Sequence, residues 1–103
     1  MKLRAISHSR SGDKGSMINI SLIAFDERDY PRLARYVTAA RAKALFAELT
    51  DGEVTRYELP SIGALNFVLH RLIGGGVTRT LAIDAHGKSL SSALLDMEIP
   101  DED

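Results

Sequence analysis

Four short stretches of the chain alternate hydrophobic with polar residues, and this alternation predicts four β-strands. In the second stretch, Ile18, Ile20 and Leu22 fall on one face, which is typical of a strand with one buried side. The third stretch ends at Pro60, which cannot donate to a strand ladder. The predicted strands are KLRAISHS (2–9), MINISLIAF (17–25), EVTRYELP (53–60) and VTRTLAID (77–84).

Other stretches space their hydrophobic residues three and four apart, which predicts helices. The first, residues 26–49, is divided into two segments. Pro31 suits a first helical turn, and Thr38 can cap a second segment that ends before Asp51-Gly52. The buried stripe expected for this second segment comprises Ala42, Leu45, Phe46 and Leu49.

Two further helices are predicted closer to the carboxyl end. Residues 61–73 have Ser61 as the expected cap and end at the glycines 74–76. In residues 86–99 we expect a helix that begins near Lys88 or Ser89. The stripes that support these helices are Ile62, Leu65, Leu69 and Leu72 in the former, and Leu90, Ala93, Leu94 and Met97 in the latter.

The predicted order of elements is β-β-α-β-α-β-α in a single domain over residues 1–103. We therefore expect an α+β fold of two layers, a mostly antiparallel four-stranded sheet with helices on one face. The glycine-containing segment between the first two strands would join them as a hairpin with a loop longer than two residues.

The amino-acid composition disfavours several classes of function. The formal net charge is −1, so bulk electrostatics do not favour nucleic-acid binding. The chain has no cysteine, which excludes disulfides and cysteine-bound metals and fits a cytoplasmic protein. No apolar run approaches the roughly 20 residues that a membrane span needs, and the amino end has no signal-peptide core.

The stretch HSRSGDKGSMIN (8–19) is the first candidate binding site. Gly12 and Gly15 permit successive backbone N–H groups to cradle an anion, and Arg10 and Lys14 would add positive charge. The alternative is an ordinary hairpin loop in which Asp13 caps backbone amides. The candidate ligand-binding residues here are Arg10, Ser11, Gly12, Asp13, Lys14, Gly15 and Asn19.

The stretch DAHGKS (84–89) is the second candidate, at the expected start of a helix where phosphate groups commonly bind. A nucleotide-binding P-loop would need glycine at position 82, which is alanine. His86 between Asp84 and Lys88 could act as an oriented acid–base group. The alternative is a plain helix start capped by Ser89. Gly87 and Ser89 complete this candidate set, and Asp84, His86 and Lys88 are its catalytic candidates.

Other chemistry has weaker support in the sequence. Ser11 and Lys14 match an S-x-x-K nucleophile motif, but that motif needs a helical turn, which the neighbouring glycines disfavour. The three histidines have no metal-ligand spacing, so no metal site is predicted. Arg79 in mid-strand must point to solvent, a partner or an anion, and Asn66 would need hydrogen-bond partners if buried. For both residues an ordinary structural role is the favoured interpretation.

Taken together, RSGDKG, Asn19, RYELP, GALNFVL, GGGVTRTL and DAHGKSLSSALLD resemble, in that order, the small C-terminal domain of the acyclic terpene utilisation (AtuA) family. The resemblance extends from about Ser7 to Ile99. It departs at Met17, where the family has a small polar residue. The positions that match its motifs are Arg10–Gly15, Asn19, Asn66, Gly74–Gly76, Arg79, Asp84 and His86–Ser89.

The resemblance implies a ferredoxin-like domain, found in the family either behind a large N-terminal domain or as a separate chain. It also implies a link to bacterial catabolism of acyclic terpenes, whose later steps use CoA thioesters. The leading hypothesis is an accessory module that docks on a large AtuA-type subunit and helps hold an anion such as an acyl-CoA. The alternatives are an independent enzyme using Asp84, His86 and Lys88, and a structural homo-oligomer.

Two expectations about arrangement follow. The stretches 8–15 and 84–89 should lie on the same side of the sheet, since two anion-binding segments at one rim would form one site. A chain of 103 residues with an uncovered sheet face or edge should also pair with itself or with a partner.

Overall fold

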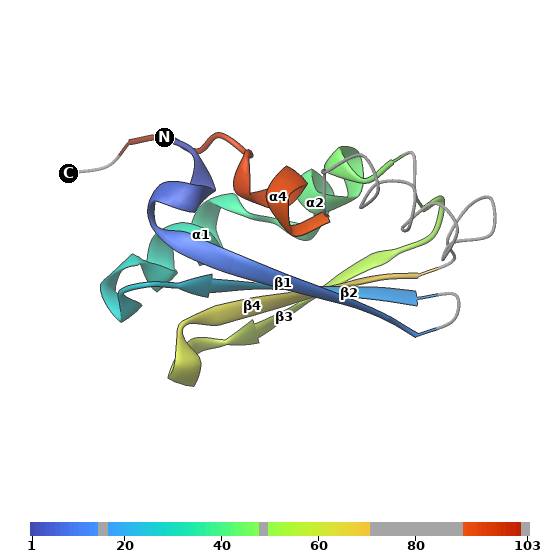
Figure 1. The fold of residues 1–103 in the computed structure, drawn as a ribbon, viewed down its shortest axis with the longest axis horizontal. Coiled ribbons are helices and arrows are strands. Elements are labelled where there is room, and N and C mark those ends of the chain that lie inside the picture. Colours follow the sequence, from blue (N-terminus) through green and yellow to red (C-terminus); the bar gives the residue numbers. More distant parts are fainter. Residues whose placement is uncertain (15–16, 48–49, 71–89, 102–103) are drawn as a thin grey trace.

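A computed structural model describes residues 1–14, 17–47, 50–70 and 90–101 (Figure 1). Its strands are β1 (Ser7–Lys14), β2 (Met17–Ala24), β3 (Val54–Leu59) and β4 (Ala64–Leu69). Its α-helices are α1 (Tyr30–Tyr36), α2 (Ala39–Leu45) and α4 (Leu90–Leu95). Short 3₁₀ turns are η1 (Leu3–Ala5), η2 (Glu27–Asp29) and η3 (Pro60–Ile62).

The strands form one sheet in the order β1-β2-β4-β3, and every neighbouring pair is antiparallel. The three helices lie on one side of this sheet (Figure 1). The predicted α+β architecture, a four-stranded antiparallel sheet with helices on one face, is therefore confirmed, and the arrangement is ferredoxin-like. No helix in the described ranges is long and apolar enough to cross a membrane.

The prediction of a helix over residues 61–73 is wrong. The segment forms η3 and then β4, in which Leu65, Phe67 and Leu69 alternate with Asn66 and Val68 and are fully buried. Residues 62–69 are so rich in apolar side chains that they fit a helical period as well as the twofold period of a strand. β4 is thus the fourth strand of the described sheet, and the predicted strand 77–84 lies outside the described residues.

The first predicted strand is shifted along the chain. Leu3–Ala5 is a 3₁₀ turn, and β1 begins at Ser7 and continues through Lys14. The segment expected to be a long polar loop is therefore mostly strand, and the register pairs Lys14 with Met17 across a two-residue connection. Gly12 adopts strand geometry without strain, and β1 lies at an edge of the sheet that the described strands form, where polar side chains can meet water.

The helical pair after β2 follows the predicted signals. Pro31 lies in the first turn of α1, and the Thr38 hydroxyl accepts a hydrogen bond from the Arg41 backbone N–H at the start of α2. Within the predicted stripe, Ala42 and Phe46 are buried, but Leu45 is 40% exposed because α2 ends there. Leu49 lies outside the described residues.

The carboxyl-terminal helix also follows its predicted stripe. Leu90 and Leu94 are buried, while Ala93 and Met97 pack at the margin of the core. The described part of this helix begins at Leu90, so the expected start at residues 88–89 lies outside the described residues.

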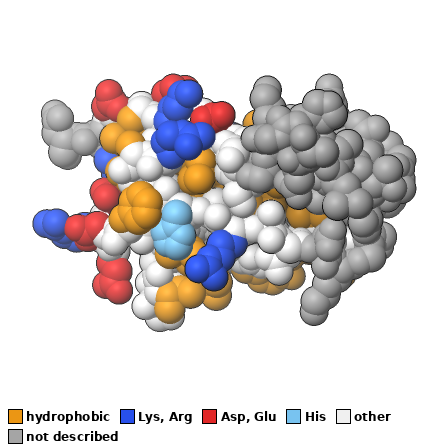
Figure 2. Space-filling model, in the orientation of Figure 1, with side chains coloured by type: hydrophobic (Ala, Val, Ile, Leu, Met, Phe, Trp, Pro, Cys, Tyr) orange, Lys and Arg blue, Asp and Glu red, His pale blue; other side chains and the backbone are white. Residues whose placement is uncertain are grey.

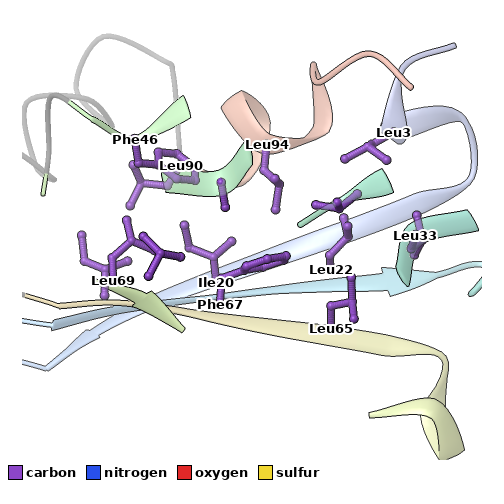
Figure 3. Packing of buried hydrophobic residues seen from close by; sticks show 14 of the residues in the cluster. Leu3, Ile20, Leu22, Leu33, Phe46, Leu65, Phe67, Leu69, Leu90 and Leu94 are labelled. Carbon is purple, nitrogen blue, oxygen red and sulfur yellow. The ribbon is translucent and has the colours of Figure 1, made fainter. Parts of the chain in front are cut away.

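The core fills the space between the helices and one face of the sheet (Figure 3). Leu33 contributes from α1, Phe46 from the end of α2, and Leu90 and Leu94 from α4. Arg56 of β3 also joins the two layers, because its Nη1 donates to the carbonyls of Ala34 and Val37 at 2.6 and 3.2 Å. These hydrogen bonds fix the carboxyl end of α1 against β3.

Replacing Phe67 tests the strand assignment of residues 64–69. Phe67→Ala should lower the free energy of unfolding by about 3–5 kcal/mol, because it empties a fully buried site. Val68→Ala, on the opposite face of the same strand, should cost about 1 kcal/mol or less. Urea unfolding followed by circular dichroism measures both, since the chain has no tryptophan. Equal losses from the two variants would contradict the assignment.

Candidate functional site

Residues of the sheet that alternate with the core residues face away from the helices, and we call this surface the open face. Within the described residues no element of the chain covers it. Its members are His8, Arg10 and Gly12 of β1, Asn19, Ser21 and Ile23 of β2, Asn66 and Val68 of β4, and Thr55, Tyr57 and Leu59 of β3.

Strand register brings distant parts of the sequence together on the open face. Arg10 pairs with Ser21, Ser21 pairs with Asn66, and Asn66 pairs with Tyr57, which makes one polar row across all four strands. Adjacent strands are about 4.8 Å apart, so the Cα atoms of Arg10 and Asn66 are about 10 Å apart. An arginine side chain can bridge much of that distance.

The neighbouring row of residues, closer to the β1–β2 connection, contains two more candidate site residues. Gly12 pairs with Asn19, and Asn19 pairs with Val68. Four sequence-predicted residues therefore gather on three neighbouring strands of the open face: Arg10, Gly12, Asn19 and Asn66.

The side chains of these polar residues are free to meet a ligand. Within the described part of the chain, no side-chain hydrogen bond or ion pair engages Arg10, Asn19 or Asn66. Ser21 Oγ donates to the Arg10 carbonyl at 3.3 Å, which ties β2 to β1 without using the guanidinium. The guanidinium of Arg10 and both asparagine amides keep their donors for an external acceptor.

Several other cations of the described residues are already paired with carboxylates. Arg28 binds Asp26 with both Nε and Nη2, and this guanidinium lowers the pKa of Asp26 to about 2. Arg4 binds Asp96 and lowers the pKa of that carboxyl. In Figure 2 the positive side chains on the visible face stand apart from one another rather than forming one patch over the described residues. Arg10 thus differs from Arg28 and Arg4 in lacking a described acidic partner.

Gly12 leaves bare backbone on the open face. A Cβ built there would meet nothing within 4 Å, and among the described glycines only Gly63 has a positive φ, of 65°. Neither backbone conformation nor packing therefore requires glycine at position 12. Its effect is to leave room beside Asn19, close to the polar row.

An aromatic pair lies at the other side of the polar row. The rings of His8 and Phe25 are stacked with centroids 5.4 Å apart. Phe25 is 66% exposed, so this pair forms an aromatic rim where β1 begins and β2 ends. Ser21 and Tyr57 were not singled out from the sequence, because both lie opposite Asn66 of β4, which was predicted as a helix.

The structure does not unite all predicted site residues. Ser11 alternates with Arg10 and Gly12, so it lies on the other face of β1. Ser11 and Lys14 lie in a strand and not on a helical turn, in agreement with the rejection of the S-x-x-K motif. Asp13 lies in β1, where it pairs with Ile18.

The second candidate stretch cannot be compared with the first. The residues that lie outside the described ranges are Gly15, Gly74–Gly76, Arg79, Asp84, His86, Gly87, Lys88 and Ser89. It stays a prediction that the stretches 8–15 and 84–89 lie on the same side of the sheet. Over the described residues, no group of three His, Asp or Glu side chains is placed to hold a metal ion.

Comparison with known protein families assigns the chain to a family. The family model described as "AtuA ferredoxin-like domain" matches residues 1–100. A comparison with curated proteins found no match, and a comparison with solved structures found none either. The matched range includes every strand of the sheet and the whole open face.

Substitution of two glycines tests whether Gly12 serves the fold. Gly12→Ala should leave the free energy of unfolding unchanged or raise it by up to about 1 kcal/mol, because the new methyl group meets open space and the unfolded chain loses freedom. Gly63→Ala should lower it by about 1–2 kcal/mol, because alanine is strained at a φ of 65°. Thermal and urea unfolding measure both. A large loss in Gly12→Ala would show that this glycine is structural.

Proposed function

Because this chain belongs to the AtuA ferredoxin-like domain family, we propose that it is the small binding module of an AtuA-type system. In this proposal it holds an anionic ligand on its open face and works with a larger AtuA-type subunit. The setting we propose is the cytoplasm and the catabolism of acyclic terpenes or other acyl-CoA compounds.

The observation that carries the proposal is the gathering of Arg10, Asn19 and Asn66 on one uncovered surface, with no described partner for their side chains. Arginine can bind a carboxylate or phosphate with two parallel hydrogen bonds, and asparagine amides can donate to the same oxygens. Gly12 would let such a ligand approach the backbone. Lys14, Arg79 and the stretch 84–89 would add to this surface if they lie at the same rim.

Docking of a larger subunit would use the remainder of the open face. Tyr57 and Leu59 are 51% and 41% exposed there, and Ile23 and Val68 are half-buried. Apolar and aromatic side chains mixed with hydrogen-bonding groups are typical of protein–protein interfaces. A ligand on the polar row would then be enclosed between the two proteins, which would exclude water and strengthen its contacts with Arg10.

A stand-alone enzyme has less support from the described residues. The only hydroxyl on the polar row besides Tyr57 is that of Ser21, which donates to a backbone carbonyl rather than to a base. The catalytic candidates Asp84, His86 and Lys88 lie outside the described ranges. The hydroxyl–base contact on the open face, between Thr55 Oγ1 and His70 Nε2 at 3.2 Å, lies outside the polar row.

Anion binding is tested by the melting temperature in different salts. Inorganic phosphate or an acyl-CoA should raise it above the value in chloride at equal ionic strength, since a ligand at a hundredfold excess over its Kd adds about 2.7 kcal/mol to the free energy of unfolding. Arg10→Ala should remove this excess, and so should Lys14→Ala and Lys88→Ala. Gly12→Leu should also remove it, by filling the space beside Asn19 without a change of charge.

The matched control is Lys43→Ala, which removes one exposed cation from α2 on the helical side. It should keep the full excess. Equal shifts in phosphate and chloride, or an excess that survives Arg10→Ala, would show that the open face is not an anion site.

Association with a larger AtuA-type subunit is tested by mixing the purified proteins and measuring the mass of the complex by light scattering. We expect a complex with this chain, and Ser21→Arg should weaken it at least tenfold because a bulky cation would stand in the middle of the open face. Ser61→Arg, an equal substitution at an exposed position of η3, should not weaken it. Failure of any complex to form would refute the docking part of the proposal.

A further inference from the structure

β3 is an edge strand of the described sheet, and its backbone has one set of unpaired groups. The Glu53 carbonyl accepts from the His70 N–H at 3.0 Å, which fixes the alternation of hydrogen bonds along the β3–β4 pair. Residues 53, 55, 57 and 59 therefore bond to β4. The N–H and C=O groups of Val54, Arg56 and Glu58 point outward from the edge, where within the described residues no strand pairs with them.

The side chains at this edge carry opposite charges. Arg56 is 22% exposed and Glu58 is 56% exposed, and both lie on the helical side of β3. The Arg56 guanidinium is held in place by its bonds to α1, and its Nη2 donates to Glu58 Oε1 at 3.3 Å. Because the Glu58 side chain is exposed, its carboxylate can also meet an arginine of a second chain.

The β3 strand of a second copy can pair with this edge only if residues whose backbone groups point outward lie opposite each other. Three antiparallel registers with twofold symmetry place at least two pairs of these outward residues opposite each other. One centres on Arg56 and sets two arginines directly opposite each other, which is repulsive. One centres on Thr55 and sets Val54 opposite Arg56. The third centres on Tyr57 and places Arg56 of each copy opposite Glu58 of the other. Because these two pairs have opposite charges, electrostatics favours this register.

The flank of β3 has room for an added strand. A hollow of about 470 Å³ lies between α2 and β3, lined by Ala39, Ala40 and Lys43 of the helix and by Val54 and Arg56 of the strand. The small alanines keep the helix from closing over this part of the edge. At the opposite edge, the outward residues of β1 are Ser7, Ser9, Ser11 and Asp13, which carry no pair of opposite charges to select a register.

We propose that the chain forms a homodimer by antiparallel pairing of β3 with β3 of a second copy, in the register that places Tyr57 opposite its own copy. Four backbone hydrogen bonds and two Arg56–Glu58 ion pairs join the copies. The twofold axis is perpendicular to the sheet, so the described strands form one continuous eight-stranded sheet. The helices of both copies lie on one side, and the two open faces lie on the other.

Single cysteines test the register, since the chain has no cysteine of its own. Tyr57→Cys should form a disulfide-linked dimer under mild oxidation, because residues opposite each other in this kind of pair have Cα atoms about 4.5 Å apart, within disulfide reach. Thr55→Cys is the matched control on the same strand and face. It lies opposite residue 59 of the second copy, about 13 Å along the strand from its own counterpart, and should not cross-link.

Charge reversal tests the interface without cysteines. Light scattering of the unsubstituted chain should give a dimer, and Glu58→Lys should weaken it at least tenfold by turning two attractive pairs into repulsive ones. Glu27→Lys, an equal charge change at an exposed position of η2, should leave the dimer intact. A monomer of 11.3 kDa at high concentration, a dimer unaffected by Glu58→Lys, or cross-linking of Thr55→Cys as efficient as that of Tyr57→Cys would overturn the proposal.

Discussion

The pairing of β2 with β4 is the interaction on which the rest of the molecule depends. It joins two hairpins, β1–β2 and β3–β4, into one sheet. On the helical side it sets Ile18 opposite Leu69, Ile20 opposite Phe67 and Leu22 opposite Leu65, and all six side chains are at most 1% exposed. A shift of the register by one residue would expose the apolar side chains of one strand to water. The burial of these side chains therefore fixes the register.

That register also fixes the open face. When Ile20 meets Phe67 inside, Ser21 must meet Asn66 outside, and Asn19 must meet Val68. The proposed ligand surface is therefore held by the hydrophobic core rather than by a flexible loop. Donors on strands that the core holds in register are well placed before a ligand arrives, which lowers the entropy lost on binding.

The sequence was sufficient to predict the layer architecture and the elements with strong local signals. β2 and β3 were predicted within a residue or two, and Pro31 and Thr38 correctly marked the beginnings of α1 and α2. The helix predicted over 61–73 failed because its apolar residues fit two periods. Pairing with β2, a contact distant in sequence, decides between them by burying Phe67.

The candidate site was predictable in its residues but not in its geometry. Arg10, Gly12, Asn19 and Asn66 were all identified, but Arg10 and Gly12 were placed in a loop and Asn66 on a helix instead of on one strand surface with Asn19. Tyr57 was missed, because its position opposite Asn66 exists only once β4 is a strand. Because residues 10–14 form a strand, the side chains of Ser11 and Arg10 lie on opposite faces of the sheet. In a loop, both could have contacted the same ligand.

The two proposed assemblies meet at the open-face side chains of β3, such as Tyr57, but otherwise use different parts of the sheet and can coexist. The homodimer uses the backbone edge of β3 with Arg56 and Glu58 on the helical side, whereas the ligand and the larger subunit use the open face. Because a twofold axis perpendicular to the sheet keeps both open faces on one side, a dimer would present two polar rows in a single plane. A partner that is itself a dimer could then bind both rows at once. The second contact would form at a raised effective concentration, so a weak open-face contact would suffice for a stable complex.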